Sequence, residues 1–295
     1  QRPINKDNAA APNLYDLCKK NGYTLVGSYA EAQKNIKKRK MLLVPQVNLD
    51  NPNKGAEALP YAIDQQEGDL NLAQIVDIAI QHLSKHDRFF MMAEGGKIDY
   101  AGHGNDGATN IQEVLDFDRA IQLAYRFYEQ HPDETLIVVT ADHETGGMAL
   151  GNNQPLRLER LAYQKCSSDT LSARLTALCQ QYTNQLTWEQ VKAFLAENTG
   201  LFGELAVTAE EETVLHTAFE QMMRQQASLK TLYADINALA AKAKEMVNHK
   251  AGLGWTTHSH TATAVPVFAI GVGAEQFTGW MDNSEIAPLI YQATR

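Results

Sequence analysis

The sequence predicts an α/β protein with a mainly parallel sheet covered by helices on both faces, into which a helical stretch is inserted. Two observations support this class. Short, continuous apolar runs alternate with helical stretches up to residue 150, a pattern typical of parallel strands that are buried on both faces. From residue 151 to about residue 250 the strand-like runs disappear, and a last apolar run follows at 265–271.

Each element of the α/β part has its own signal. The predicted strands are the apolar runs at 23–26, 41–44, 88–93, 135–140 and 265–271. Ser28 suits a helix N-cap because Glu31 follows it three residues later. Further helices, with apolar residues at helical spacing or at the end of the chain, are predicted at 71–84, 107–130 and 285–293.

The helical stretch divides the chain into three predicted parts. Residues 14–150 and 251–295 form one α/β core, residues 151–250 a helical insertion, and residues 1–13 a linker or arm. Within the insertion, where Thr187 suits an N-cap, we expect helices at 157–182, 187–197, 208–226 and 229–247.

Composition excludes some classes of function. The net charge of −9 argues against nucleic-acid binding, because phosphate backbones are bound through an excess of Lys and Arg. We interpret the basic residues at 34–40 as a solvated helix end. No apolar run approaches the roughly 18 residues that a membrane span needs. Cys166 and Cys179 could pair within a helical hairpin, so an oxidising compartment is allowed but not required.

Side chains of metal-ligand type follow two of the predicted strands. Glu94, Asp99 and His103 come after the run at 88–93, and Asp142 and His143 come directly after the next one. Ligands of parallel α/β sheets collect beyond the carboxyl ends of the strands. Carboxylates mixed with imidazoles suit zinc together with magnesium, because zinc accepts nitrogen and oxygen ligands whereas magnesium prefers oxygen.

Two pairs of histidines need separate interpretations. His258 and His260 lie one residue apart before the last strand, so both could reach the site, or one could support it from behind. His82 and His86 lie four apart on a predicted helix, but no neighbouring glycines or strand ends accompany them. We interpret this second pair as structural or surface histidines. No nucleophile accompanies the candidate metal ligands.

The motifs around these residues resemble those of the alkaline phosphatase family. Residues 94–103 match the family element E-G-x-x-I-D-x-x-x-H, residues 140–143 match T-A-D-H, and residues 260–266 are similar to H-T-G-x-x-V-P. The segment 59–64 also resembles the stretch that leads into the metal-bearing part of the family. The motifs occur in the family order across most of 14–150 and 251–295.

The resemblance implies a three-layer α/β/α core and a metal-dependent hydrolase acting on phosphate monoesters. The implied mechanism uses a Ser or Thr nucleophile and a phosphoenzyme. The implied ligands are Asp99, His103 and His260 for one zinc ion, Asp142 and His143 for a second, and Glu94 for one magnesium ion. His258 is then a neighbour that could support the ligands from behind. A periplasmic or extracytoplasmic location and a homodimer are also typical of the family.

The chain departs from the family pattern in lacking the half that carries the nucleophile. Residues 167–170 read Ser-Ser-Asp-Thr, but they lie in the helical insertion and are discounted. The chain begins at Gln1 without a signal-peptide pattern, so we expect an incomplete C-terminal half: a truncated protein, a proteolytic piece or one part of a split protein. It would supply about half of the metal site, be inactive alone, and self-associate or pair with the missing half through exposed sheet edges.

Two other readings compete with this one. A sulfatase, phosphodiesterase or phosphomutase with the same core would keep the Asp-His pair but differ at 94–103. A non-catalytic metal-binding or interaction domain would keep the ligands without any nucleophile.

Overall fold

The computed structural model describes residues 14–44, 59–151, 154–182, 185–224, 228–230 and 235–293, so the predicted linker or arm at 1–13 lies outside the described residues. The helices are α1 (Leu14–Lys20), α2 (Tyr29–Lys34), η1 (Ala62–Asp64), α3 (Leu72–Leu83), α4 (Lys97–His103), α5 (Gly107–Gln130), η2 (Leu158–Tyr163), α6 (Ser168–Gln181), α7 (Trp188–Thr199), α8 (Ala209–Met223), α9 (Ala238–Ala251), η3 (Ala274–Gln276) and α10 (Asn283–Ala293). None of these helices is long and apolar enough to cross a membrane.

The strands pair two by two within the described part of the chain. They are β1 (Thr24–Val26), β2 (Met41–Leu43), β3 (Leu136–Val139), β4 (Glu144–Thr145), β5 (Ala149–Leu150), β6 (Ser228–Lys230), β7 (Asp235–Asn237), β8 (Leu253–Gly254), β9 (His260–Thr261) and β10 (Phe268–Gly271). The pair β1–β2 is parallel, and β3–β10, β4–β9, β5–β8 and β6–β7 are antiparallel. The sheet is therefore present as fragments.

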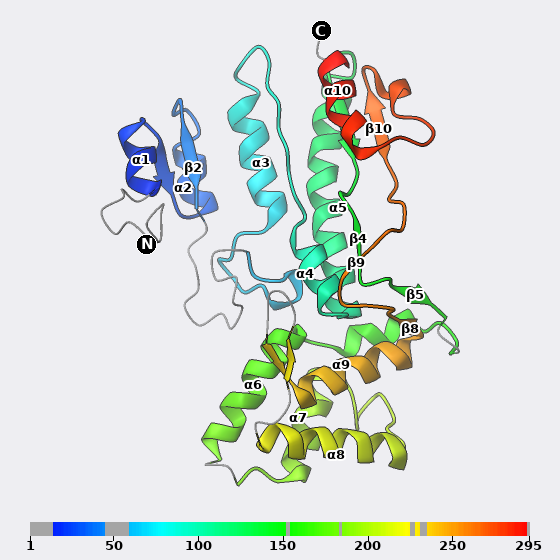
Figure 1. The fold of residues 1–295 in the computed structure, drawn as a ribbon. Helices are drawn as coiled ribbons and strands as arrows, with labels where there is room; N and C mark the ends of the chain where they lie inside the picture. Colours follow the sequence, from blue (N-terminus) through cyan, green and yellow to red (C-terminus); the bar gives the residue numbers. More distant parts are fainter. Residues whose placement is uncertain are drawn as a thin grey trace, which may run out of the picture.

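Figure 1 shows how the elements are arranged around the long helix α5. Helix α3 packs along α5, and β10 and α10 lie near its C-terminal end. Helices α6 to α9 gather at the opposite end of the molecule, and α4, β4 and β9 lie between these two regions (Figure 1). The small unit of α1, β1, α2 and β2 stands to one side, next to α3.

The cap predicted at Ser28 is confirmed. The Ser28 hydroxyl accepts a hydrogen bond from the Glu31 backbone and starts α2. Asn71 starts α3 through a capping box, in which its side chain and that of Gln74 each bond the other residue's backbone. Such caps satisfy N–H groups at the first turn that have no partner inside the helix.

The predicted strand at 88–93 is wrong. These residues form no strand and pair with none in the described part of the chain, and Phe90 and Met92 are 68% and 81% exposed. A strand needs a neighbour for its backbone N–H and C=O groups, which an apolar run alone does not provide. For the same reason β3 and β10, predicted as buried, are only half-buried, and Phe268 is exposed.

Two of the predicted helices in the helical stretch need correction. The helix predicted at 157–182 divides into η2 and α6, because Ser167 caps a new helix start by accepting from the Thr170 backbone. The region predicted as a helix at 229–247 begins instead with strands β6 and β7, which pair antiparallel, after which Asn237 caps α9. The cap predicted at Thr187 is confirmed as a capping box, and Thr208 starts α8 with a second one.

The main hydrophobic core lies in the helical stretch. Leu195, Leu215 and Leu239, from three different helices, are completely buried in one cluster with their neighbours. The other buried cluster, Val26, Ala32 and Ile78, is much smaller. Burial of apolar area is the main stabilising term in folding, so the helical stretch contributes most of this stabilisation.

The alternative of a disulfide between Cys166 and Cys179 is not realised, because both are free thiols. Cys166 is buried, and burial raises the pKa of its thiol to about 12. This thiol is therefore neutral and unreactive at ordinary pH.

Candidate metal centre

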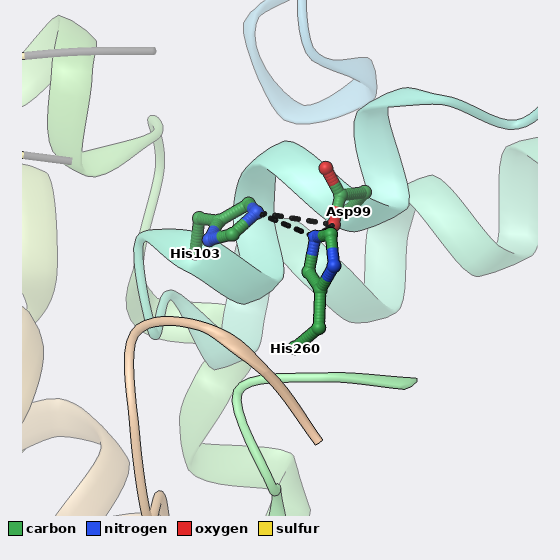
Figure 2. A group of neighbouring side chains, drawn as sticks. All are labelled: Asp99, His103 and His260. Atoms are coloured by element: carbon green, nitrogen blue, oxygen red, sulfur yellow. Dashed lines mark hydrogen bonds and ion pairs between the residues drawn. The ribbon is translucent and has the colours of Figure 1, made fainter. Parts of the chain in front are cut away.

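Three of the predicted ligands meet where α4 approaches β9. Asp99 and His103 lie four residues apart on α4, so they share one face of that helix. His260 comes from β9, which pairs with β4 and lies opposite Thr145. Figure 2 shows the Asp99 carboxylate and the two imidazole rings converging on one point.

The spacing of the donor atoms suits a zinc ion. His103 Nε2 lies 3.2 Å from His260 Nε2 and 3.4 Å from Asp99 Oδ1, and His260 Nε2 lies 3.6 Å from Asp99 Oδ1. Tetrahedral zinc with bonds of about 2.0–2.1 Å separates its ligand atoms by about 3.4 Å. The three side chains therefore fit the ion, and the 48% exposed side chain of His260 leaves the fourth side open to solvent.

His103 has the tautomer that a metal needs. Its Nδ1 lies 2.6 Å from the backbone carbonyl oxygen of His258, and a carbonyl only accepts, so Nδ1 carries the hydrogen. Nε2 then carries no hydrogen and can ligate a metal ion, and it faces Asp99 Oδ1 and His260 Nε2. A backbone carbonyl behind a histidine ligand fixes its tautomer and ring orientation in the same way in many metal sites.

His258 also contacts His103 through its side chain. Its Nδ1 lies 2.9 Å from the backbone oxygen of His103. The two residues are thus joined by a reciprocal pair of hydrogen bonds, and the His258 ring itself is not in the triad. That His258 supports the centre as a neighbour stays a prediction, and these two contacts with His103 are consistent with it.

Thr145 connects the triad to the second predicted pair of ligands. Its hydroxyl lies 2.6 Å from Asp99 Oδ1 and 3.1 Å from His143 Nδ1. A carboxylate only accepts, so the hydroxyl donates to Asp99 and accepts from His143 Nδ1–H. His143 Nε2 is therefore unprotonated, and it lies 3.4 Å from Asp142 Oδ2. These two atoms could bind one cation together.

The remaining predicted ligands lie outside the triad. The His143 ring stacks on His260, with centroids 3.5 Å apart, but its donor atom is directed to Asp142. Glu94 is exposed in the loop before α4, with its carboxylate over Gly96. Within the described residues, Asp99, His103 and His260 form the single group of three ligand atoms compact enough for one ion.

Sequence reasoning missed Thr145 and Glu144, which build the frame of the site. Glu144 accepts from the Gly147 backbone and from the Thr261 hydroxyl, and so joins β4 to β9. A signal for Thr145 exists, because residues two apart in an extended segment face the same side, which places it beside His143.

His82 has the structural role that its helix predicted. Its Nδ1 lies 3.1 Å from the backbone oxygen of Ile36, so it connects α3 to the segment after α2. Neither His82 nor His86 belongs to a compact group of ligands in the described chain.

The discounted segment 167–170 is a buried helix start. Ser167 is 1% exposed, and its hydroxyl donates to the Asp64 carboxylate, as does the Thr170 hydroxyl. The Ser167 backbone also donates to Asp64. Each group is thus engaged in holding Asp64 at the N-terminus of α6, where the helix dipole favours a negative charge.

Buried ionisable groups surround this helix start. Asp169 and Glu113 are both buried, and burial raises the pKa of each to about 7. Lys97 lies over the rings of Tyr61 and Tyr100, at 4.3 and 4.9 Å from their centroids, and burial lowers its pKa. The protein therefore holds two carboxyl groups that change charge near neutral pH.

Asp169→Asn should make the chain less sensitive to alkaline pH. Burial, with the carboxylate of Asp106 next, raises the Asp169 pKa from 3.8 to about 7, so the stability it contributes is present below pH 4 and lost as the pH rises through 7. The quantity to compare is the free energy of unfolding of Asp169→Asn minus that of the wild type. This difference should be larger at pH 8 than at pH 4 by on the order of 3 kcal/mol. Urea unfolding at both pH values measures this difference, in which any constant effect of the amide cancels. An unchanged difference would contradict the prediction.

These observations define a class: an α/β protein with a candidate carboxylate–histidine metal centre where a helix meets a strand pair. The sequence model of the alkaline phosphatase family matches residues 6–295. Alkaline phosphatase 3 of Bacillus subtilis (strain 168) is 32% identical over 294 residues, which cover 95% of this chain and 54% of that protein. The repressible alkaline phosphatase of Saccharomyces cerevisiae is 28% identical over 273 residues, or 87% and 45% of the two chains.

A solved structure gives the same assignment. The cold-active alkaline phosphatase from the psychrophile Shewanella sp. has a TM-score of 0.76 and 27% identity, covering 99% of this chain and 64% of that one. The chain belongs to the alkaline phosphatase family. This confirms both the resemblance and the α/β class, and the helical stretch has a counterpart in the Shewanella structure because nearly the whole chain is covered. The chain spans about half the length of the curated relatives it matches.

Proposed function

We propose that this chain supplies about half of the metal centre of a protein that hydrolyses phosphate monoesters with two zinc ions and one magnesium ion. The observation that carries the proposal is the triad, whose three donor atoms lie 3.2 to 3.6 Å apart with the tautomer of His103 already set. Asp99, His103 and His260 would hold the first zinc ion. When bound, such ions supply Lewis acidity toward a phosphate ester.

The chain's own residues orient these donors. The Thr145 hydroxyl holds Asp99 Oδ1 and keeps His143 Nε2 unprotonated, and the His258 carbonyl holds His103. The one carboxylate offsets only part of the charge of a zinc ion, and the two imidazoles bind it as neutral ligands. The occupied site therefore has a net positive charge, which attracts a phosphate dianion despite the chain's overall charge of −9.

Within the described residues, the second half of the proposed centre is incomplete. Asp142 and His143 present two donor atoms for the second zinc ion, and zinc takes about four ligands. Glu94 offers a single carboxylate toward magnesium, which prefers about six oxygens. The remaining ligands and the nucleophile are therefore expected from outside these 295 residues.

Exposed apolar groups support association with the part of the protein that carries the missing ligands and the nucleophile. Phe90 and Met92 extend from the loop that leads into α4, and Phe268 lies on β10. The pair β3–β10 has no further strand beside it in the described chain. Unpaired strand edges with apolar side chains favour pairing with another chain. An extracytoplasmic location also belongs to this proposal and rests on family membership.

The proposal is tested by loading the chain with zinc and magnesium, repurifying it, and assaying an aryl phosphate at mildly alkaline pH. We expect bound zinc and no turnover. Turnover that survives repurification and disappears in Asp142→Ala would overturn the half-site part of the proposal. A chain that binds no zinc at all would overturn the metal centre itself.

A further inference from the structure

The turn after His103 is held by the helical stretch. Residues 104–106 connect α4 to α5, and Asn105 has a left-handed backbone with φ of +48°. Lys244 on α9 donates to the Gly104 carbonyl, and the Asn248 amide donates to the Asn105 carbonyl at 2.7 Å. Two carbonyl groups of the turn thus receive partners from α9.

The same asparagine also contacts the start of α5. Asn248 Oδ1 accepts from the Gly107 backbone N–H at 3.1 Å, so one side chain bonds the turn on both sides of Asp106. Gly107 lies so close to α9 that a Cβ there would be 2.6 Å from Asn248 Oδ1. The end of α4 and the start of α5 are therefore fixed relative to one helix.

Helix α6 holds the turn from another side. The Asp106 carboxylate accepts from the Ser168 backbone at 2.7 Å and from the Gln164 amide at 2.8 Å. It also accepts from the Thr109 backbone, as the N-cap of α5. A carboxylate at two helix starts is favoured by both dipoles.

These contacts are buried. Lys244 and Asn248 are 4% and 3% exposed. A buried ammonium group is costly unless it is paired, so Lys244 depends on the Gly104 carbonyl and the nearby charge of Asp106. Neither side chain can move without breaking its bonds to the turn.

We infer that the helical stretch positions the metal centre, with Lys244 and Asn248 as positioning residues that set the place of His103. This inference rests on the proposed zinc site. His103 is the last residue of α4, one residue before the turn, so a shift of the turn moves its imidazole relative to His260 on β9. Metal affinity is sensitive to such shifts, because mutation of residues behind the ligands typically lowers it about 10- to 100-fold.

The test measures zinc affinity by chelator competition in Asn248→Asp and Lys244→Met. Asn248→Asp keeps the oxygen that accepts from Gly107 but replaces the donor to Asn105 with a second oxygen. We expect at least about a tenfold loss of zinc affinity in both variants, with shifted His103 imidazole nitrogen resonances in the metal-free protein. Circular dichroism establishes that each variant is folded, and if Lys244→Met is not, Asn248→Asp decides.

Two controls separate positioning from general stability. Lys242→Met removes an exposed lysine of α9 that pairs with Glu245, and should leave zinc affinity unchanged. Leu195→Ala opens a cavity in the core of the helical stretch, away from the turn, and should lower stability but not zinc affinity. Folded Asn248→Asp with wild-type affinity and imidazole resonances overturns the inference while the zinc site stands. Absence of zinc binding by the wild type would instead overturn the proposed function and, with it, the inference.

Discussion

Replacing His260 with alanine should lower the affinity of the chain for zinc by at least about 100-fold, because it removes a ligand and not merely a residue behind one. The variant keeps the Asp99–His103 pair, whose donor atoms lie 3.4 Å apart, but two donors hold zinc far more weakly than three. The His260 side chain is half exposed, so its loss should leave the fold intact. Chelator competition at pH 7.5 measures the affinity.

His86→Ala is the matched control for this variant. His86 is an exposed histidine that follows α3 and lies outside the compact ligand group, so its loss should not change zinc affinity. Equal zinc affinity of the wild type and His260→Ala would remove His260 from the site. A drop with His86→Ala as large as that with His260→Ala would show nonspecific binding by surface histidines.

Gly146→Ala should destabilise the protein by about 3 kcal/mol or more, since it adds a strained backbone to an overlap. Gly146 has a φ of +93°, where a side chain is unfavourable. A Cβ there would lie 2.6 Å from the Trp255 ring and 2.9 Å from the Gly102 carbonyl oxygen. Because Gly146 follows Thr145 directly, its displacement should also weaken zinc binding. Urea unfolding measures the first effect.

Gly68→Ala isolates the backbone part of this cost. Gly68 has nearly the same φ, +94°, but nothing lies within 4 Å of an added Cβ. The Gly68→Ala variant should therefore lose only about 1–2 kcal/mol of stability, and its zinc affinity should stay at the wild-type level. Equal losses of stability in the two variants would show that the contact with Trp255 does not matter.

Elements with local signals are predictable from this sequence. Ser28 and Thr187 start helices as predicted, because a cap is decided by residues within one turn. The strand predicted at 88–93 fails because strand formation depends on a partner elsewhere in space, which an apolar run does not reveal. The single helix predicted at 157–182 fails for a different reason. The Ser167 cap that starts α6 is local, but the Asp64 carboxylate to which the Ser167 hydroxyl donates lies about a hundred residues away in the chain.

The candidate site divides in the same way. The spacing of Asp99 and His103 places them on one helical face without any knowledge of the fold. The approach of His260 depends on the pairing of β4 with β9. The spacing of His258 and His260 left open which of them reaches the site, and the family motif indicated His260. Lys244 and Asn248 carry no motif at all, because their role follows from the packing of α9 on a turn far away in the chain.

The pairing of β5 with β8 bears on how the triad assembles during folding. Thr145 and His260 are separated by more than a hundred residues, most of which lie between β5 and β8. Once those residues have folded around their own core, closing β4 onto β9 orders a loop of only roughly ten residues, which reduces the entropic cost of closure by roughly 2 kcal/mol. The helical stretch therefore acts as an internal cross-link, and it makes two ends of a long loop into near neighbours.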